Sequence, residues 1–243
     1  MKKSLELLID LTTEMAKERL PYFDESYQAR QLTDSDEIHA ARSLSTKRFV
    51  ELGKYHKAAV TPEGLPLHDP MYELSTFFAS FQDKEMIAST RLLWSDTATI
   101  SDLRLPTDEI DIPMRDFLHS QAPGSIAEIG SLAKRPGVSK IATLKVLREV
   151  FLFASEHDID YFVCGLEQNV LPTYERLFGG ALTKLSDETV EFPGVNGEQV
   201  PLLIEAQRAF GKQRQEMQQR TLGERAIGFG VRHFFKQRIP TIA

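Results

Sequence analysis

The 243-residue sequence predicts an α/β fold of the α+β sandwich type, in which a mixed central sheet is flanked by helices and extended by helical additions at both ends of the chain. Two observations lead to this prediction. The hydrophobic pattern of residues 125–205 alternates strand, helix, strand, helix and strand. Two short apolar runs before them, separated by polar residues, are typical of a β-hairpin. A hydrophobic fraction of 42% supplies a sizeable core, so we expect one domain over residues 1–204 and a basic helical extension packed on it over 205–243.

Two helices are expected before the sheet. Residues 1–20 carry apolar positions at helical spacing and are followed by a proline, which favours a helix that stops there. Residues 37–52 predict a second helix. Ser35 or Asp36 is expected to cap its start, and Gly53 to end it.

The hairpin follows a long loop. Four prolines and glycines in residues 57–73 predict irregular structure there. The hairpin strands are expected at 75–81 and 86–94. Residues 95–124 have a mixed pattern and predict mostly loop, with a short helix at 114–120.

The core of the domain begins with a strand at 125–133 and a tight basic turn at 134–140. A long amphipathic helix is expected at 141–157 and a buried strand at 159–166. The remaining elements are a short helix, a glycine break and two strands, at 172–177, Gly179–Gly180, 181–192 and 199–205.

Composition limits the class of partner. A net charge of -6 and a pI near 5.6 argue against a general nucleic-acid binder, which needs a basic surface to neutralise phosphates. The single cysteine, Cys164, excludes an internal disulfide and lies in an apolar run, which favours a buried inert thiol in a reducing compartment. With no apolar stretch of roughly 18 residues, a cytoplasmic location is expected. His68, His119 and His157 lack ligand spacing, so no metal site and no tightly bound cofactor is indicated.

The C-terminal segment is strongly basic. Residues 205–243 hold eight Lys or Arg against three Glu, and residues 207–219 predict a helix. One interpretation is a solvated basic helix packed on the core. The other is a docking surface for an acidic partner protein or a negatively charged lipid surface, which makes peripheral membrane contact an open alternative.

Residues 125–180 are predicted to form a strand, a basic loop, a long helix, a strand and a helix that carries a tyrosine and ends in glycine. This order resembles the central part of the GCN5-related N-acetyltransferase fold. In that family a loop of the pattern Gln/Arg-x-x-Gly-x-Gly/Ala binds pyrophosphate, and residues 134–139, Lys-Arg-Pro-Gly-Val-Ser, are a relaxed version of it. Glycine lets the backbone approach phosphate oxygens, and the following helix start presents unpaired N–H groups to an anion. The alternative is an ordinary surface turn. The residues that the resemblance assigns to the donor's phosphopantetheine or coenzyme A are Lys134, Arg135, Gly137, Ser139, Lys140 and Asn169.

A tyrosine follows at the place where this family carries its general acid. Asn169, Tyr174 and Gly179 are similar in order to the family's Asn, Tyr and Gly after the fifth strand. The resemblance implies that Tyr174 protonates the departing thiolate, which helps without being obligatory because a thiolate is already a fair leaving group. The alternative is a packed ring with its hydroxyl in solvent.

Four further features stand out: an Arg- and Phe-rich helix over 41–49, Asp69 ahead of the hairpin, the run Ser-Thr-Arg-Leu ending at Leu92, and a Glu128-x-x-Ser131 strand. In these features the chain resembles the acyl-homoserine lactone synthases and the N-acyl amino acid synthases, which share this fold and take long acyl chains from acyl carrier protein. Ser131 stands where those families place arginine. This departure weakens the case for a lactone synthase's substrate, because arginine is the side chain that grips a carboxylate with two parallel hydrogen bonds.

The resemblance implies a set of acyl-transfer residues. Backbone N–H groups of Gly130, Ser131 and Leu132 would stabilise the oxyanion, and Glu128 would accept the amine proton directly or through water. The alternative for Glu128 is a carboxylate paired to an arginine.

Four further residues are expected to bind substrates. Arg91 would bind a substrate carboxylate with Asp69 nearby, and its alternative is a strand-end ion pair. Phe78 and Trp94 would line the base of an acyl-chain tunnel, and the alternative is that they are ordinary core residues.

The function expected from these residues is transfer of a fatty acyl group from an acyl carrier protein thioester to the amine of an amino acid or similar small amine. Alternatives are an acetyltransferase that uses acyl-coenzyme A, or a catalytically silent module that binds a ligand or protein on the same fold.

Overall fold

The computed structural model describes residues 27–209. The helix predicted at 1–20 lies outside the described residues, and so does the helix predicted at 207–219 apart from residues 207–209, which are helical. Within residues 27–209 no helix is both long and apolar enough to cross a bilayer.

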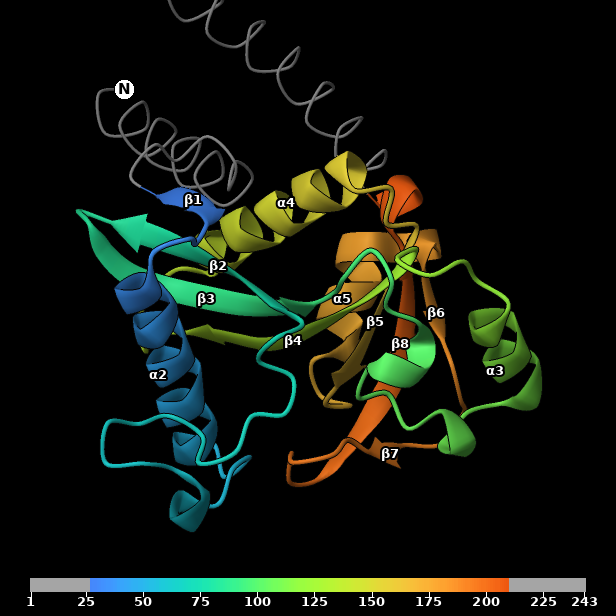
Figure 1. The fold of residues 1–243 in the computed structure, drawn as a ribbon, viewed down its shortest axis with the longest axis horizontal. Helices are drawn as coiled ribbons and strands as arrows, with labels where there is room; N and C mark the ends of the chain where they lie inside the picture. Colours follow the sequence, from blue (N-terminus) through green and yellow to red (C-terminus); the bar gives the residue numbers. More distant parts are fainter. Residues whose placement is uncertain (1–26, 210–243) are drawn as a thin grey trace, which may run out of the picture.

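A mixed sheet of eight strands forms the centre of the fold (Figure 1). The strand order is β1 (Gln28–Gln31), β2 (Ser75–Gln82), β3 (Glu85–Leu93), β4 (Ile126–Lys134), β5 (Tyr161–Leu166), β8 (Glu198–Glu205) and β6 (Leu182–Lys184), and β7 (Val190–Glu191) pairs with β8. Only β4 and β5 pair in parallel; the other strand pairs are antiparallel. This sheet with its flanking helices confirms the predicted fold class.

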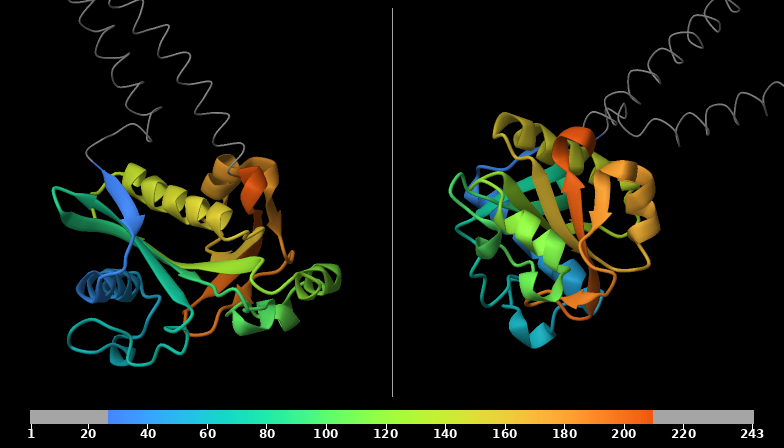
Figure 2. Two further views of the ribbon diagram at one scale, coloured as in Figure 1. Left: turned by 45° about the horizontal axis from the view of Figure 1, so that its top comes forward. Right: turned by 90° about the vertical axis from the view of Figure 1, so that its right-hand side faces the viewer.

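The helices cover the two faces of the sheet (Figure 2). α4 (Lys140–Glu156) and α5 (Leu171–Phe178) pack on one face, and α2 (Ser35–Glu51) packs on the other. α3 (Ile112–His119) and the 3-10 turns Ile100–Asp102 and Thr107–Glu109 form the connection from β3 to β4. The other 3-10 turns are Lys57–Ala59 and Gly179–Ala181.

The structure corrects one local prediction and adds one strand that was not predicted. The cap of α2 is Asp34, not Ser35 or Asp36: its carboxylate accepts the backbone N–H groups of Asp36 and Glu37 at 3.0 Å. Strand β1 was not predicted, because its sequence Gln-Ala-Arg-Gln has neither apolar alternation nor β-branched residues. β1 is held instead by its backbone pairing with the edge of β2.

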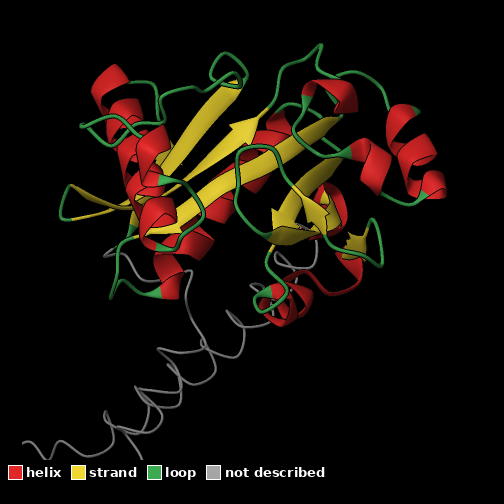
Figure 3. Cartoon of the chain, turned by 90° about the horizontal axis from the view of Figure 1, so that it is seen from below, coloured by secondary structure: helices red, strands yellow, loops and turns green. Residues whose placement is uncertain are grey.

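The sheet divides at β4 and β5, and this division positions the site. The two strands pair only between Ile126–Glu128 of β4 and Tyr161–Val163 of β5, after which β4 continues along β3 and β5 continues along β8. In Figure 1 the half that contains β2, β3 and β4 runs across the view, whereas β5, β6 and β8 run down it. The same separation is visible from below (Figure 3).

Candidate active site

A pocket of about 410 Å³ fills the opening between the separated ends of β4 and β5. Residues 128–132 of β4 form one wall, and residues 164–166 of β5 with the following Glu167 form the facing wall. Tyr174 and Phe178 of α5 close it on one face of the sheet, and the end of α2 closes it on the other. Pockets of this size that combine apolar walls with a few polar groups are typical sites for small molecules.

A β-bulge places backbone donors in the β4 wall. Gly130 is opposite Arg91 and Ala133 is opposite Ser89, so the register shifts by one residue between them. Ser131 and Leu132 therefore have no registered partner on β3, and they lie beyond the stretch that pairs with β5. Ser131 has a left-handed backbone with φ of 54°, an unusual conformation for a residue other than glycine. The predicted oxyanion donors are thus brought to the pocket wall by the bulge.

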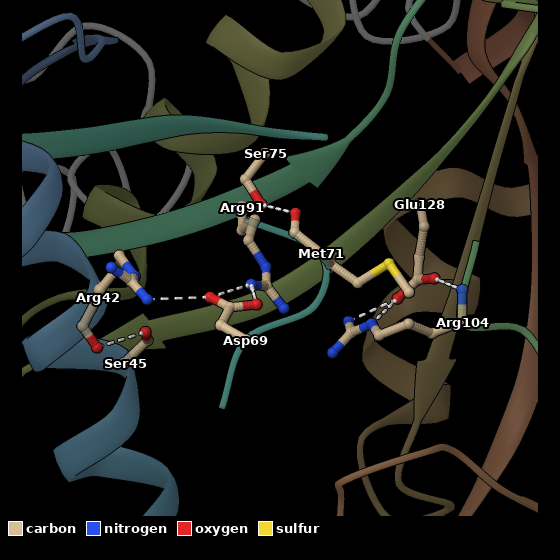
Figure 4. Close-up of polar contacts among 8 residues, drawn as sticks. All are labelled: Arg42, Ser45, Asp69, Met71, Ser75, Arg91, Arg104 and Glu128. Carbon is tan, nitrogen blue, oxygen red and sulfur yellow. Dashed lines mark hydrogen bonds and ion pairs between the residues drawn. The ribbon is translucent and has the colours of Figure 1, made fainter. Parts of the chain in front are cut away.

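Glu128 is held in a buried ion pair with Arg104 at the base of this wall (Figure 4). Arg104 Nε and Nη2 donate to Glu128 Oε1 at 2.8 and 2.5 Å, and the Arg104 backbone N–H donates to Oε2 at 2.7 Å. Burial by itself lowers the pKa of Arg104, but the charge and hydrogen bonds of Glu128 outweigh this and raise it. Both carboxylate oxygens are therefore engaged, so Glu128 accepts a substrate proton only if one of these bonds opens.

Gly130 allows this pair to lie against the strand. A Cβ atom at position 130 would collide with Arg104 Nη2. The absence of a side chain therefore lets the guanidinium cross β4 beside the bulge.

Tyr174 and Cys164 face the pocket from α5 and β5. Burial, with a smaller contribution from Cys164, raises the pKa of the Tyr174 phenol, which keeps it protonated at neutral pH. Burial also raises the pKa of the Cys164 thiol to about 12, so Cys164 is an inert wall residue at neutral pH.

The basic turn before α4 contains one left-handed glycine, and several of its side chains are already engaged by other groups. Lys134 Nζ donates to the Val138 carbonyl at 2.6 Å, and Arg135 pairs with Glu85. Gly137 has φ of 77°, the left-handed conformation that glycine tolerates. Ser139 caps α4 by accepting the Ile141 N–H at 3.2 Å.

The other two residues of the predicted donor set are solvent-exposed. Lys140 is the first residue of α4, and Asn169 lies in the turn before α5. Neither residue, nor the turn at 134–140, lines the pocket.

Arg91 and Asp69 lie in a second buried cluster, outside the pocket lining (Figure 4). Arg91 Nη1 donates to both Asp69 oxygens, at 2.7 and 2.9 Å, and Arg42 Nη2 of α2 donates to Asp69 Oδ2 at 3.2 Å. The guanidinium of Arg42 lies 4.5 Å from the ring centre of Tyr72. The Nε atoms of both arginines are buried without a partner among the described residues. Two cations facing one anion leave one excess positive charge, which suits a carboxylate ligand.

Phe78 and Trp94 lie in the core beneath α4, away from the pocket lining. Phe78 is 1% exposed and meets Phe153 edge-on at 5.5 Å between ring centres. Trp94 Nε1 donates to the Gly124 carbonyl at 2.7 Å, and its ring also packs on Phe153. The structure does not bring these two residues to the other candidate substrate residues.

Solved structures share this fold at low sequence identity. No family model matches the sequence, and no curated protein matches it significantly. The N-acyl amino acid synthase FeeM from uncultured soil microbes superposes with a TM-score of 0.57 at 19% identity, over 75% of this chain and 92% of its own. The chain has the GCN5-related N-acetyltransferase fold.

Two acyl-homoserine lactone synthases share this N-acetyltransferase fold with the chain. LasI superposes with a TM-score of 0.54 at 15% identity, over 75% of this chain and 92% of LasI. BjaI, a coenzyme A-dependent enzyme, superposes with a TM-score of 0.58 at 12% identity, over 78% of this chain and 89% of BjaI. The predicted resemblance of fold is therefore confirmed.

Several residues of this pocket were missed from the sequence. Arg104 lies in the stretch 95–124, whose mixed pattern gave no reason to select a single arginine. Lys54 and Glu167 pair at 2.7 Å across the pocket lining although they are far apart in the chain. Gln199 did carry a signal, because it is a polar residue directly before the apolar run 200–204 of its strand.

Proposed function

We propose that the protein is an N-acyltransferase that moves a fatty acyl group from an acyl carrier protein thioester to the amine of an amino acid or similar small amine. The observation that supports this most strongly is the separation of β4 and β5 at a bulge, which places backbone N–H groups of the β4 wall and the protonated Tyr174 on one pocket.

The reaction would proceed by attack of a neutral amine on the thioester carbonyl carbon. The carbonyl oxygen becomes an oxyanion beside the N–H groups of residues 130–132, where a donor of this kind typically contributes about 3 kcal/mol to the transition state. The C–S bond then breaks, and the thiolate takes a proton from Tyr174 or from water. Because Arg104 occupies both oxygens of Glu128, we assign the amine proton to water, with Glu128 holding Arg104 beside the bulge.

The anionic part of the donor would lie at the start of α4. Ser139, Lys140 and the backbone around Gly137 supply N–H groups and positive charge there, and Asn169 lies in the turn before α5. Acyl carrier protein is the first choice of donor, because the basic segment 205–243 complements an acidic carrier. Acyl-coenzyme A is the second candidate, favoured by the left-handed Gly137 in the loop before α4.

The acceptor would be recognised through its carboxylate. The cluster of Arg42, Asp69 and Arg91 has an excess positive charge and two unpartnered N–H groups within described residues. A buried charge of this kind is stabilised by an anionic ligand. An amino acid provides that carboxylate next to its reactive amine.

Product analysis tests this function. The protein is incubated with acyl carrier protein thioesters and acyl-coenzyme A of several chain lengths, together with pooled amino acids, and products are identified by mass spectrometry. An N-acyl amino acid formed from the carrier thioester supports the proposal. Acyl transfer from acyl-coenzyme A alone would identify acyl-coenzyme A as the donor instead. No product from any donor, with the ligands still bound, indicates a non-catalytic binding module.

Deletion of residues 210–243 should weaken carrier binding, and liposome sedimentation of the same variant tests a membrane role for that segment.

A further inference from the structure

Part of the pocket lining is apolar, and we call the space beside it the apolar chamber; its residues are Phe49, Leu52, Gly165, Phe192 and Val195. A Cβ atom at Gly165 would lie 2.5 to 2.9 Å from three ring atoms of Phe192, so the ring packs directly on the β5 backbone. This contact closes one side of the chamber. The chamber therefore suits an apolar group of limited size.

The charged residues of the chamber wall are paired with one another. Lys54 Nζ lies 2.7 Å from Glu167 Oε1, and Arg104 Nη2 lies 2.5 Å from Glu128 Oε1. Each cation is thus matched by an anion, and the wall has no net charge. A charged ligand group would lose its hydration there without gaining an opposite charge, so a neutral group is favoured.

Gln199 is the exception to this pairing. It lies on β8 and its side chain is buried, with 7% of the residue exposed. Its Nε2 atom is buried and has no hydrogen-bond partner within the described part of the chain. Three other buried polar atoms of residues 27–209 share this state, Arg42 Nε, Ser80 Oγ and Arg91 Nε, but none of these residues lines the pocket.

A buried amide donor without a partner is unfavourable in a folded protein, and such groups usually mark a place where a ligand or water completes the bond. The charged side chains of the pocket lining are engaged with one another, and no acceptor among the described residues bonds to Gln199 Nε2. An oxygen of the bound substrate would supply one.

We propose that Gln199 selects the substrate by donating a hydrogen bond from Nε2 to a neutral oxygen on an otherwise apolar substrate group held in this chamber. This rests on the proposed function for the identity of the two substrates. The oxygen belongs either to the side chain of the acceptor amino acid or to an oxygenated acyl chain of the donor, and the two sources are separated by the experiment.

The test measures dissociation constants by calorimetry for pairs of ligands that differ by one oxygen. The acceptor arm compares tyrosine with phenylalanine and threonine with valine. The acyl arm compares a 3-hydroxyacyl-coenzyme A with the unsubstituted thioester of equal length. Full-length wild-type protein is compared with Gln199→Leu, which keeps the volume but removes the donor. Ser80→Ala is the matched control, because Ser80 Oγ is also buried and unpartnered but lies away from the pocket.

We expect the wild type and Ser80→Ala to prefer the oxygenated ligand of one arm by roughly tenfold, and Gln199→Leu to lose that preference. The arm that responds identifies the source of the oxygen. Equal affinity for both members of every pair in the wild type overturns the proposal, and so does a preference that survives in Gln199→Leu.

A second readout does not depend on any ligand or on turnover. Because each substitution removes a buried polar atom that has no partner, Gln199→Leu and Ser80→Ala should both raise the urea midpoint of the unliganded protein. A lower midpoint for Gln199→Leu alone would show that Gln199 has a structural partner, which also overturns the proposal. Selective binding without any acyl transfer would instead count against the proposed function and leave the role of Gln199 standing.

Discussion

Replacing Arg104 by methionine should destabilise the protein strongly, because it strips a buried carboxylate of its counter-ion. The substitution removes the Nε and Nη2 hydrogen bonds to Glu128 Oε1 and leaves only the backbone N–H bond to Oε2. The Glu128 side chain is 1% exposed, so water does not replace the lost partner. Breaking a buried pair by removing one member typically costs about 3–5 kcal/mol of unfolding free energy. In a protein of this size that corresponds to a fall in Tm of roughly 10 °C.

The chain offers a control with the same separation but a different environment. Arg30 and Glu37 also approach to 2.5 Å, but their side chains are 50% and 31% exposed. Arg30→Met should therefore lose less than about 1 kcal/mol in the same urea titration.

Removing both members of the buried pair isolates the uncompensated charge. Arg104→Met with Glu128→Met should recover most of the loss, since two apolar side chains of similar volume can replace a buried pair. The reasoning is refuted if Arg104→Met loses no more than Arg30→Met, or if the double variant is as unstable as the single one.

Three further predictions concern the pocket. Tyr174→Phe should lower kcat by at most about 10²-fold. Because burial raises the pKa of this phenol above its ordinary value of 10.0, kcat of the wild type should show no descending limb from Tyr174 below pH 9, and a limb there that Tyr174→Phe abolishes would contradict this. Ser131→Val should lower the free energy of unfolding in urea titrations by about 1–3 kcal/mol while Ser131→Gly does not, because φ of 54° is strained for a β-branched residue. Equal stabilities of the two variants would contradict the bulge geometry. Cys164, with a pKa of about 12, should resist a disulfide reagent at pH 8 in the native state and react fully in denaturant, because its native thiolate fraction is on the order of 10⁻⁴. The stability that the buried neutral thiol contributes should be intact below pH 9 and be lost as the pH rises towards 12. Rapid labelling of the native protein would contradict the burial of Cys164.

Local sequence signals located most of the sheet and helices. The hairpin predicted at 75–81 and 86–94 is observed as Ser75–Gln82 and Glu85–Leu93, and the helix predicted at 141–157 as Lys140–Glu156. These elements have a strong hydrophobic period, and their boundaries follow from turn and capping residues. Strand β1 was missed because its residues are mostly exposed and only backbone pairing to β2 holds them.

The candidate site was only partly accessible to the same reasoning. Glu128, Tyr174 and the 130–132 segment were selected from the sequence and do line one pocket. Phe78 and Trp94 were selected as aromatic strand residues, but the structure packs both against Phe153 of α4. An apolar residue in a strand can face either a core or a cavity, and which one it faces depends on the helix laid over it.

The sequence by itself determined the order of elements, the glycine and proline positions that end them, and the residue types available for acyl transfer, because these depend on interactions between near neighbours in the chain. Only the tertiary structure decided which polar and charged side chains have partners. It paired Glu128 with Arg104 and Asp69 with Arg42 and Arg91, and it left Gln199 without a partner. These outcomes depend on contacts between residues more than 20 positions apart, which form where β4 and β5 separate and the loops around them meet.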